Sequence, residues 1–194
     1  MKRTPFLIHA LLLLIAAPAL ATAGGAPTPQ PGDVLPAIEL EVPRDADQRR
    51  YLGLQAAERF RIGDIQSEVV ILQVFSMYCP HCQREAPDIN RLFETIEADR
   101  RYRGRVKLIG IGAGNSSFEV GVFRQSFTIP FPLFADESLT IHQQLGEVRT
   151  PYFFGVRIAE DGAARVFYSR PGGLDGAAPH KFLKILLENA GLQW

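Results

Sequence analysis

Residues 69–82 read VVILQVFSMYCPHC, an apolar run that ends in a C-x-x-C pair. The run from 69 to 75 is β-branched or otherwise apolar apart from Gln73, which predicts a central strand covered on both faces. Beyond the second cysteine, apolar residues recur at helical spacing from Ile89 to Ile96. Cys79 and Cys82 are therefore expected at the junction between a buried strand and a helix.

This junction favours thiol chemistry. At the N-terminus of a helix, free backbone N–H groups and the helix dipole stabilise a Cys79 thiolate, so its pKa should lie below the free value of about 8.5. Cys82, one turn further on, is expected to be sheltered and to attack a mixed disulfide formed on Cys79. Pro80 suits the first helical turn, and His81 can carry a positive charge that favours the thiolate. A more stable thiolate makes the disulfide more oxidising, so CPHC should lean towards oxidation.

Other roles for the pair are less consistent with the sequence. The chain has two cysteines, and a bond between residues so close would close a small loop that constrains the unfolded chain little. A zinc site normally needs four ligands, but His9, His142 and His180 are isolated, and His142 is expected on a helix surface. We expect no metal and no cofactor. A copper(I) metallochaperone of the envelope, using both thiolates, is the alternative, and a redox-inert binding module is a third.

The first residues resemble a signal peptide. Lys2 and Arg3 precede an apolar stretch at 6–17 and small residues at 21–23, so residues 1–23 are expected to be cleaved after Ala23. The apolar stretch is shorter than the about 20 residues that span a bilayer, although an uncleaved membrane anchor is the alternative. Export to the periplasm or beyond follows. We expect a Pro/Gly-rich linker over 24–35 and one domain over 36–194.

Composition limits the partners. Apolar residues make up 46% of the 194 residues, enough for a substantial core in one domain. Basic and acidic residues number 21 each, so the formal net charge is zero. Because binding to phosphate backbones requires a basic excess, nucleic acid is not an expected partner. The chain is expected to be a monomer.

Hydrophobic periodicity predicts an α/β fold. Strands that alternate with helices imply a parallel part of the sheet, and a late hairpin implies an antiparallel part. A mixed central sheet with helices on both faces satisfies both requirements. Strands are predicted over residues 37–42, 51–54, 69–75, 105–111, 152–158 and 164–168, and helices after Cys82 and over 117–127, 139–145 and 181–189, with a turn and short helix at 60–65.

Two segments carry a family resemblance. Residues 75–87, FSMYCPHCQREAP, and residues 148–154, VRTPYFF, resemble the TlpA/ResA-like branch of the thioredoxin superfamily, a redoxin or AhpC/TSA-like group. Glu85 and Pro87 match that family's E-x-P after C-x-x-C. Residues 109–136 resemble its central helical insertion, and the similarity covers about residues 34–190. The chain departs from the pattern at Tyr78, where a Trp is more frequent, and at His81.

The resemblance implies a thioredoxin-like fold with an N-terminal extension and a central helical insertion. It adds Glu85, a partly buried acid that assists proton movement, to the expected catalytic residues Cys79, Pro80, His81 and Cys82. It also implies a cis bond before Pro151 and a substrate contact at the Thr150 backbone. Tyr78, beside Cys79, is expected to contact substrate as well.

The implied function is thiol:disulfide exchange with exported proteins. Reduction in cytochrome c maturation, with a membrane thiol as electron donor, is the family's commonest role, and oxidation and isomerisation remain open. A peroxiredoxin is not expected. Ser76 stands three residues before Cys79 as in the peroxidase motif P-x-x-x-T/S-x-x-C, but Leu72 occupies the position of its proline.

Overall fold

The computed structural model describes residues 25–55, 57–172, 174 and 178–190. The expected signal peptide at 1–23 lies outside these residues. No helix in this part of the chain is long and apolar enough to cross a membrane.

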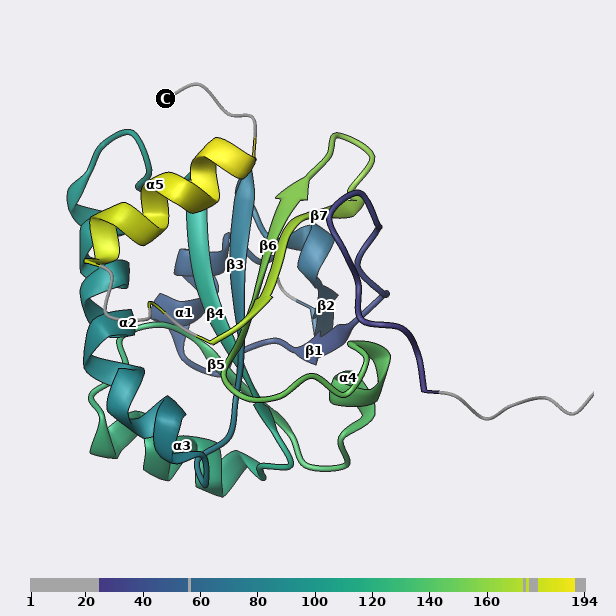
Figure 1. The fold of residues 1–194 in the computed structure, drawn as a ribbon, viewed down its shortest axis with the longest axis vertical. Coiled ribbons are helices and arrows are strands. Elements are labelled where there is room, and N and C mark those ends of the chain that lie inside the picture. The colour runs from purple at the N-terminus through teal and green to yellow at the C-terminus, as the bar shows by residue number, and fades with distance from the viewer. Residues whose placement is uncertain (1–24, 56, 173, 175–177, 191–194) are drawn as a thin grey trace, which may run out of the picture.

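A five-stranded mixed sheet forms the centre of the domain (Figure 1). Its strand order is β5-β4-β3-β6-β7, in which β3, β4 and β5 are parallel, while β6 pairs antiparallel with both of its neighbours, β3 and β7. This is the mixed sheet that the alternation of elements predicted. The strands span Val69–Phe75 (β3), Val106–Ala113 (β4), Leu133–Asp136 (β5), Tyr152–Ile158 (β6) and Ala164–Pro171 (β7).

Helices cover both faces of the sheet, as expected. In Figure 1, α5 lies in front of the sheet and α1 behind it. Apolar residues of α2, α3 and α5 form one core with the front face, and α1, α4 and the small β1–β2 sheet contribute to a second core on the other face. These elements span Glu39–Glu41 (β1), Ala46–Leu52 (α1), Arg59–Arg61 (β2), Ile62–Asp64 (η1, a 3-10 helix), Pro80–Ala98 (α2), Ser117–Ser126 (α3), Thr140–Gln144 (α4) and Pro179–Asn189 (α5).

Strand β3 is buried along its whole length because both cores meet on it. Val69, Ile71 and Phe75 pack into the core under α2, whereas the alternate residues from Val70 to Val74 pack into the other. Successive side chains of a strand point to opposite faces, so a two-sided strand reads as continuously apolar. The start of α2 is fixed by this buried strand.

The structure differs from the predicted elements in three places. Residues 51–54, expected as a strand, contain the end of α1, which Asp45 caps at its start and Gly53 ends with a φ of 67°. The segment 60–65 holds the end of β2 and then η1. Strand β5 was not predicted, since four residues among prolines give little periodicity and its pairing with β4 defines it. The other strands and helices lie within a few residues of their predicted bounds.

The segment expected as a linker is attached to the domain over residues 25–35. The N–H of Leu35 donates to Ala164 O over 2.8 Å, and the N–H of Gly32 donates to Val166 O over 2.9 Å. Val34 forms an antiparallel bridge with Arg165. The segment therefore runs along the outer edge of β7 and covers backbone groups that an edge strand exposes.

Tyr51 binds the backbone of β4 in the part of that strand that β5 does not pair with. Strand β5 pairs with β4 from Gly110 to Ala113, and earlier in β4 the Leu108 N–H donates to the Tyr51 hydroxyl over 2.7 Å. The Lys107 ammonium lies 4.1 Å from the centre of the Tyr51 ring. Burial raises the pKa of Tyr51, so the phenol stays protonated. Helix α1 is thus joined to β4 through one side chain.

Replacing Tyr51 with Phe should lower the free energy of unfolding by about 1–3 kcal/mol, because the Leu108 N–H loses its partner. The ring contact with Phe93, at 5.6 Å between centroids, would be kept. Tyr51→Ala, which removes ring and hydroxyl, should cost more, about 3–5 kcal/mol. Urea unfolding followed by circular dichroism measures both, and equal stability of Tyr51→Phe and the unchanged protein would contradict this account.

Candidate active site

Cys79 caps the N-terminus of α2. Its Sγ accepts a hydrogen bond from the Cys82 N–H over 3.3 Å, in the position that a Ser or Asp side chain usually takes. Pro80 is the first helical residue, as expected. The Cys79 thiol lies 3.3 Å from the Thr150 carbonyl oxygen, to which it donates. Two segments far apart in sequence thus meet at one sulfur.

The surroundings of Cys79 favour its thiolate. Burial alone would raise the pKa of Cys79, but hydrogen bonds outweigh it and hold the pKa below its ordinary value. They come from the Cys82 thiol, the Thr150 side chain and the backbone N–H groups of Cys82 and His81. The free N–H groups at a helix start supply part of this effect.

Cys82 is in the opposite situation. Its side chain is fully buried in the core under α2, and both cysteines are free thiols. Burial, together with the hydrogen bond to Cys79, raises the pKa of Cys82 to about 12. At neutral pH, Cys79 is the sulfur that ionises and Cys82 the sulfur that keeps its proton.

The His81 side chain differs from the sequence-based expectation. The Arg84 guanidinium donates to His81 Nδ1 over 2.9 Å, so that nitrogen carries no proton in this contact. Both side chains are exposed. His81 acts on Cys79 through its backbone N–H, and its ring holds the fixed charge of Arg84 in the first turns of α2.

Polar side chains that the sequence did not single out hold the loop before Cys79. Asn115, fully buried just after β4, accepts the Met77 N–H over 2.8 Å and donates to Ser76 Oγ over 3.4 Å. Gln83 donates to the Met77 carbonyl over 2.7 Å. The signal that the sequence offers for Asn115 is its position just after the glycine-rich end of β4.

Tyr78 is fixed beside Cys79 with its ring in solvent. The side chain is 65% exposed, and its hydroxyl donates to the Glu119 carboxylate. This hydrogen bond raises the pKa of Tyr78 and lowers the pKa of Glu119. Glu119 also accepts the Ser116 N–H over 2.7 Å in the capping box that starts α3.

The loop opposite Cys79 contains a cis Thr150–Pro151 peptide bond, as expected. His142, expected as a surface residue, is half-buried and its Nε2 donates to the Val148 carbonyl over 2.8 Å. Gly146 allows the N-terminal segment to approach, since a Cβ there would lie 2.4 Å from Thr28 N. The loop is thus supported by α4 on one side and by the N-terminal segment on the other.

Glu85 lies one helical turn after Cys82 on α2 and is half-buried. Its Oε1 accepts the Leu174 N–H over 2.5 Å, which joins α2 to the segment after β7. In the described part of the chain, His, Cys, Asp and Glu form no group of three or more that could hold a metal ion.

Two sequence comparisons show which known proteins this chain resembles. The sequence profile of the AhpC/TSA family matches residues 31–168. The thiol-disulfide oxidoreductase ResA of Halalkalibacterium halodurans is 23% identical over 133 residues, which cover 69% of this chain and 70% of ResA.

Solved structures show the fold. A protein assigned as the thiol:disulfide interchange protein DsbE of Chlorobium tepidum superposes with a TM-score of 0.61 at 15% identity, covering 84% of this chain and 99% of its own. The thioredoxin domain of a thiol-disulfide oxidoreductase from Bacteroides vulgatus gives 0.57 at 14% identity, with coverages of 81% and 98%. The expected thioredoxin-like fold is confirmed.

The unequal pKa values predict selective alkylation. In the reduced protein, iodoacetamide should label Cys79 with a pH midpoint below that of the unfolded chain, because only the thiolate reacts and its pKa is lowered. Cys82 should stay unlabelled at neutral pH, since its pKa is about 12 and its side chain is buried. Mass spectrometry of the two cysteines gives both rates, with the urea-unfolded protein as the control in which they converge. Faster labelling of Cys82 would contradict the assignment.

Proposed function

This chain belongs to the AhpC/TSA family, and we propose that it is a TlpA/ResA-like thiol:disulfide oxidoreductase that exchanges disulfides with other proteins through Cys79 and Cys82. The observation that carries the proposal is the inequality of the two sulfurs. Cys79 caps a helix with a lowered pKa, and the buried Cys82 keeps its proton. A nucleophile and a resolving thiol need this difference.

The exchange proceeds in two balanced steps. The Cys79 thiolate attacks one sulfur of the partner's disulfide, forming a Cys79–partner bond and releasing the other partner sulfur as a thiolate. Cys82 then loses its proton and attacks Cys79 Sγ, forming the Cys79–Cys82 disulfide and releasing the first partner sulfur. The partner gains two electrons and the pair loses two. A dithiol reductant must return the pair to the reduced form, and the same steps in reverse would oxidise a partner.

Neighbouring groups support these steps. Glu85, one turn after Cys82 on α2, is the carboxylate that we assign to accept the Cys82 proton. The Thr150 backbone, which already contacts Cys79 Sγ, would align the partner chain at the reactive sulfur. Pro151 follows with a fixed ring and no N–H to compete for hydrogen bonds.

The proposed cellular location is the periplasm. The signal-like residues 1–23 support export, with exported thiol or disulfide proteins as substrates of a monomeric enzyme in the periplasm. The relative named ResA is a thiol-disulfide oxidoreductase. We propose reduction in cytochrome c maturation, with a membrane thiol as electron donor, because the TlpA/ResA-like resemblance of residues 75–87 and 148–154 implies it.

The Cys82→Ser variant should accumulate mixed disulfides through Cys79, because the first bond forms but no buried thiol resolves it. Incubation with oxidised envelope extract, acid quenching and non-reducing electrophoresis would reveal them, and peptide mass spectrometry would locate the bond. Cys79→Ser should trap nothing, and the double Ser variant is the blank. Trapping through Cys82 in Cys79→Ser would reverse the roles.

The His81→Ala variant should have a reduction potential more negative by tens of millivolts, where about 30 mV corresponds to about 1.4 kcal/mol. The ring holds the Arg84 guanidinium near the start of α2, so without the ring this positive charge is free to move away from the Cys79 thiolate that it favours. Redox titration against glutathione measures the shift. Arg84→Ala should move the potential in the same direction, and an unchanged or more positive value in both variants would refute this electrostatic account.

A further inference from the structure

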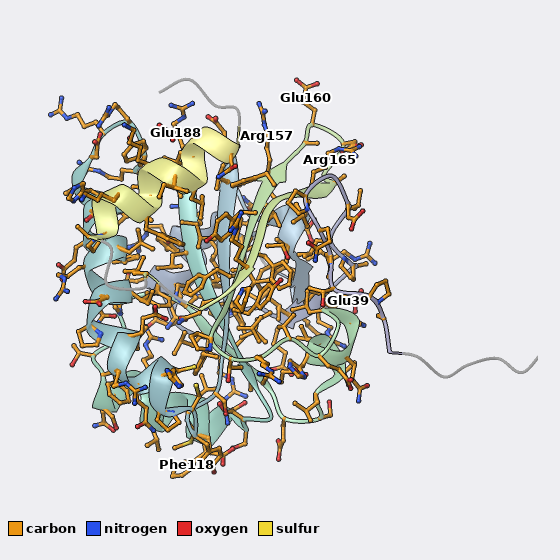
Figure 2. The ribbon with its side chains drawn as sticks, in the orientation of Figure 1. Glu39, Phe118, Arg157, Glu160, Arg165 and Glu188 are labelled. Carbon is orange, nitrogen blue, oxygen red and sulfur yellow. The ribbon has the colours of Figure 1, made fainter. Side chains whose placement is uncertain are left out.

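Exposed apolar side chains gather at the edge of the sheet that carries Cys79. Within the described residues, the large apolar side chains with substantial exposure include Tyr78 at 65%, Phe118 at 80% and Leu139 at 39%. These three follow β3, β4 and β5, respectively. Because parallel strands end at the same edge, the three lie in neighbouring segments there, Phe118 in the first turn of α3 and the other two in loops. Figure 2 shows Phe118 at the end of the molecule where α3 lies.

Two contacts connect the three segments. The Tyr78 hydroxyl binds Glu119, which directly follows Phe118 in α3. On the other side, a Cβ placed on Gly114 would lie 3.4 Å from the Leu139 side chain, and Gly114 directly precedes Asn115. We call Tyr78, Phe118 and Leu139 the apolar rim. It begins at the residue next to Cys79 and continues across β4 towards β5.

Leu139 is held outward by the local backbone. Its φ is 61°, which is uncommon for a residue with a bulky side chain. The Leu139 N–H donates to the Asp136 carbonyl over 3.1 Å. The buried Asp136 carboxylate accepts the Ile141 and His142 N–H groups over 3.0 and 2.8 Å, which fixes the start of α4. Backbone strain of this kind is concentrated at functional sites.

We propose that the apolar rim binds the residues flanking the reactive cysteine of a protein substrate, and that the preferred substrates present extended, apolar segments there. The inference rests on the proposed function and adds its substrate class. Tyr78, the first residue of the rim, is the chain neighbour of Cys79, so a polypeptide whose sulfur reaches Cys79 passes next to Tyr78. Contact with the rim would remove apolar surface from water on both partners. A small disulfide such as oxidised glutathione lacks the side chains to reach Phe118 and Leu139.

The test compares substrates that differ only beside the cysteine. Two uncharged peptides, one with Leu and Phe and the other with Ser around a single cysteine, are activated as mixed disulfides with thionitrobenzoate. The protein without residues 1–23, carrying Cys82→Ser, is mixed with each peptide. Its Cys79 attacks the peptide sulfur, forming a Cys79–peptide disulfide and releasing thionitrobenzoate. The absorbance of the released thionitrobenzoate gives the rate. The apolar peptide should react about tenfold faster, equivalent to about 1.4 kcal/mol.

Variants of the rim should reduce this preference. Phe118→Ser and Leu139→Asn, in which Asn tolerates the positive φ, should each lower the apolar-to-polar rate ratio about threefold. The matched control is Ile185→Ser, which removes a 51% exposed apolar side chain from α5 and should leave the ratio unchanged. Circular dichroism confirms that each variant is folded.

Two results would overturn the proposal about the rim and leave the proposed function standing. One is an equal rate for both peptides at Cys79, and the other is a ratio that does not respond to Phe118→Ser. If Phe118→Ser turned a dimer into a monomer in sedimentation without changing the ratio, the rim would be a contact between copies of the chain, and the proposal would be wrong. No release from either peptide, with Cys79 unmodified, would instead overturn the proposed function and this inference together.

Discussion

The hydrogen bond from the Cys82 N–H to Cys79 Sγ is the constraint on which the site depends. It makes a sulfur the cap of α2, so the charge on that sulfur is part of the stability of the helix end. A thiolate satisfies the N–H groups better than a neutral sulfur in a disulfide. The energy of the helix start is therefore linked to the redox state of the pair, and this linkage needs a rigid strand, β3, to set the position of the cap.

The rest of the site converges on that cap from distant parts of the chain. Asn115 fixes the loop before it from the end of β4, and Thr150 contacts the sulfur from the loop before β6. His142 in turn supports the Thr150 loop from α4. Each contact is a single hydrogen bond of modest strength. Together they place the reactive sulfur between a helix end and a carbonyl, with the second sulfur sheltered behind it.

Much of this could be predicted from the sequence wherever the pattern is local. Strand β3 is an apolar run apart from Gln73, and β6 begins with five buried residues of low polarity. The C-x-x-C and Thr-Pro motifs located Cys79, Cys82 and a cis Pro151. Strand β5 could not be predicted in this way, since its four residues are defined by pairing with β4. The contacts of Asn115, Glu119 and His142 also escaped prediction because their partners lie outside any local motif. The contact between Arg84 and His81 could have been predicted from the sequence, because the two residues are one helical turn apart.

The N-terminal segment enters the domain on the same side as the loop that contacts Cys79. Residues 32–35 run along β7, and Thr28 packs against Gly146 in the loop that leads to Thr150. The described chain thus enters the domain beside the loop that faces the reactive sulfur, on the right of Figure 1. Gly25, the first described residue, lies close to the Glu147 side chain in the same loop. A tether there would present Cys79 at a restricted set of angles to its surroundings, so the geometry of encounter would be set by the first described residues as well as by the sulfur itself.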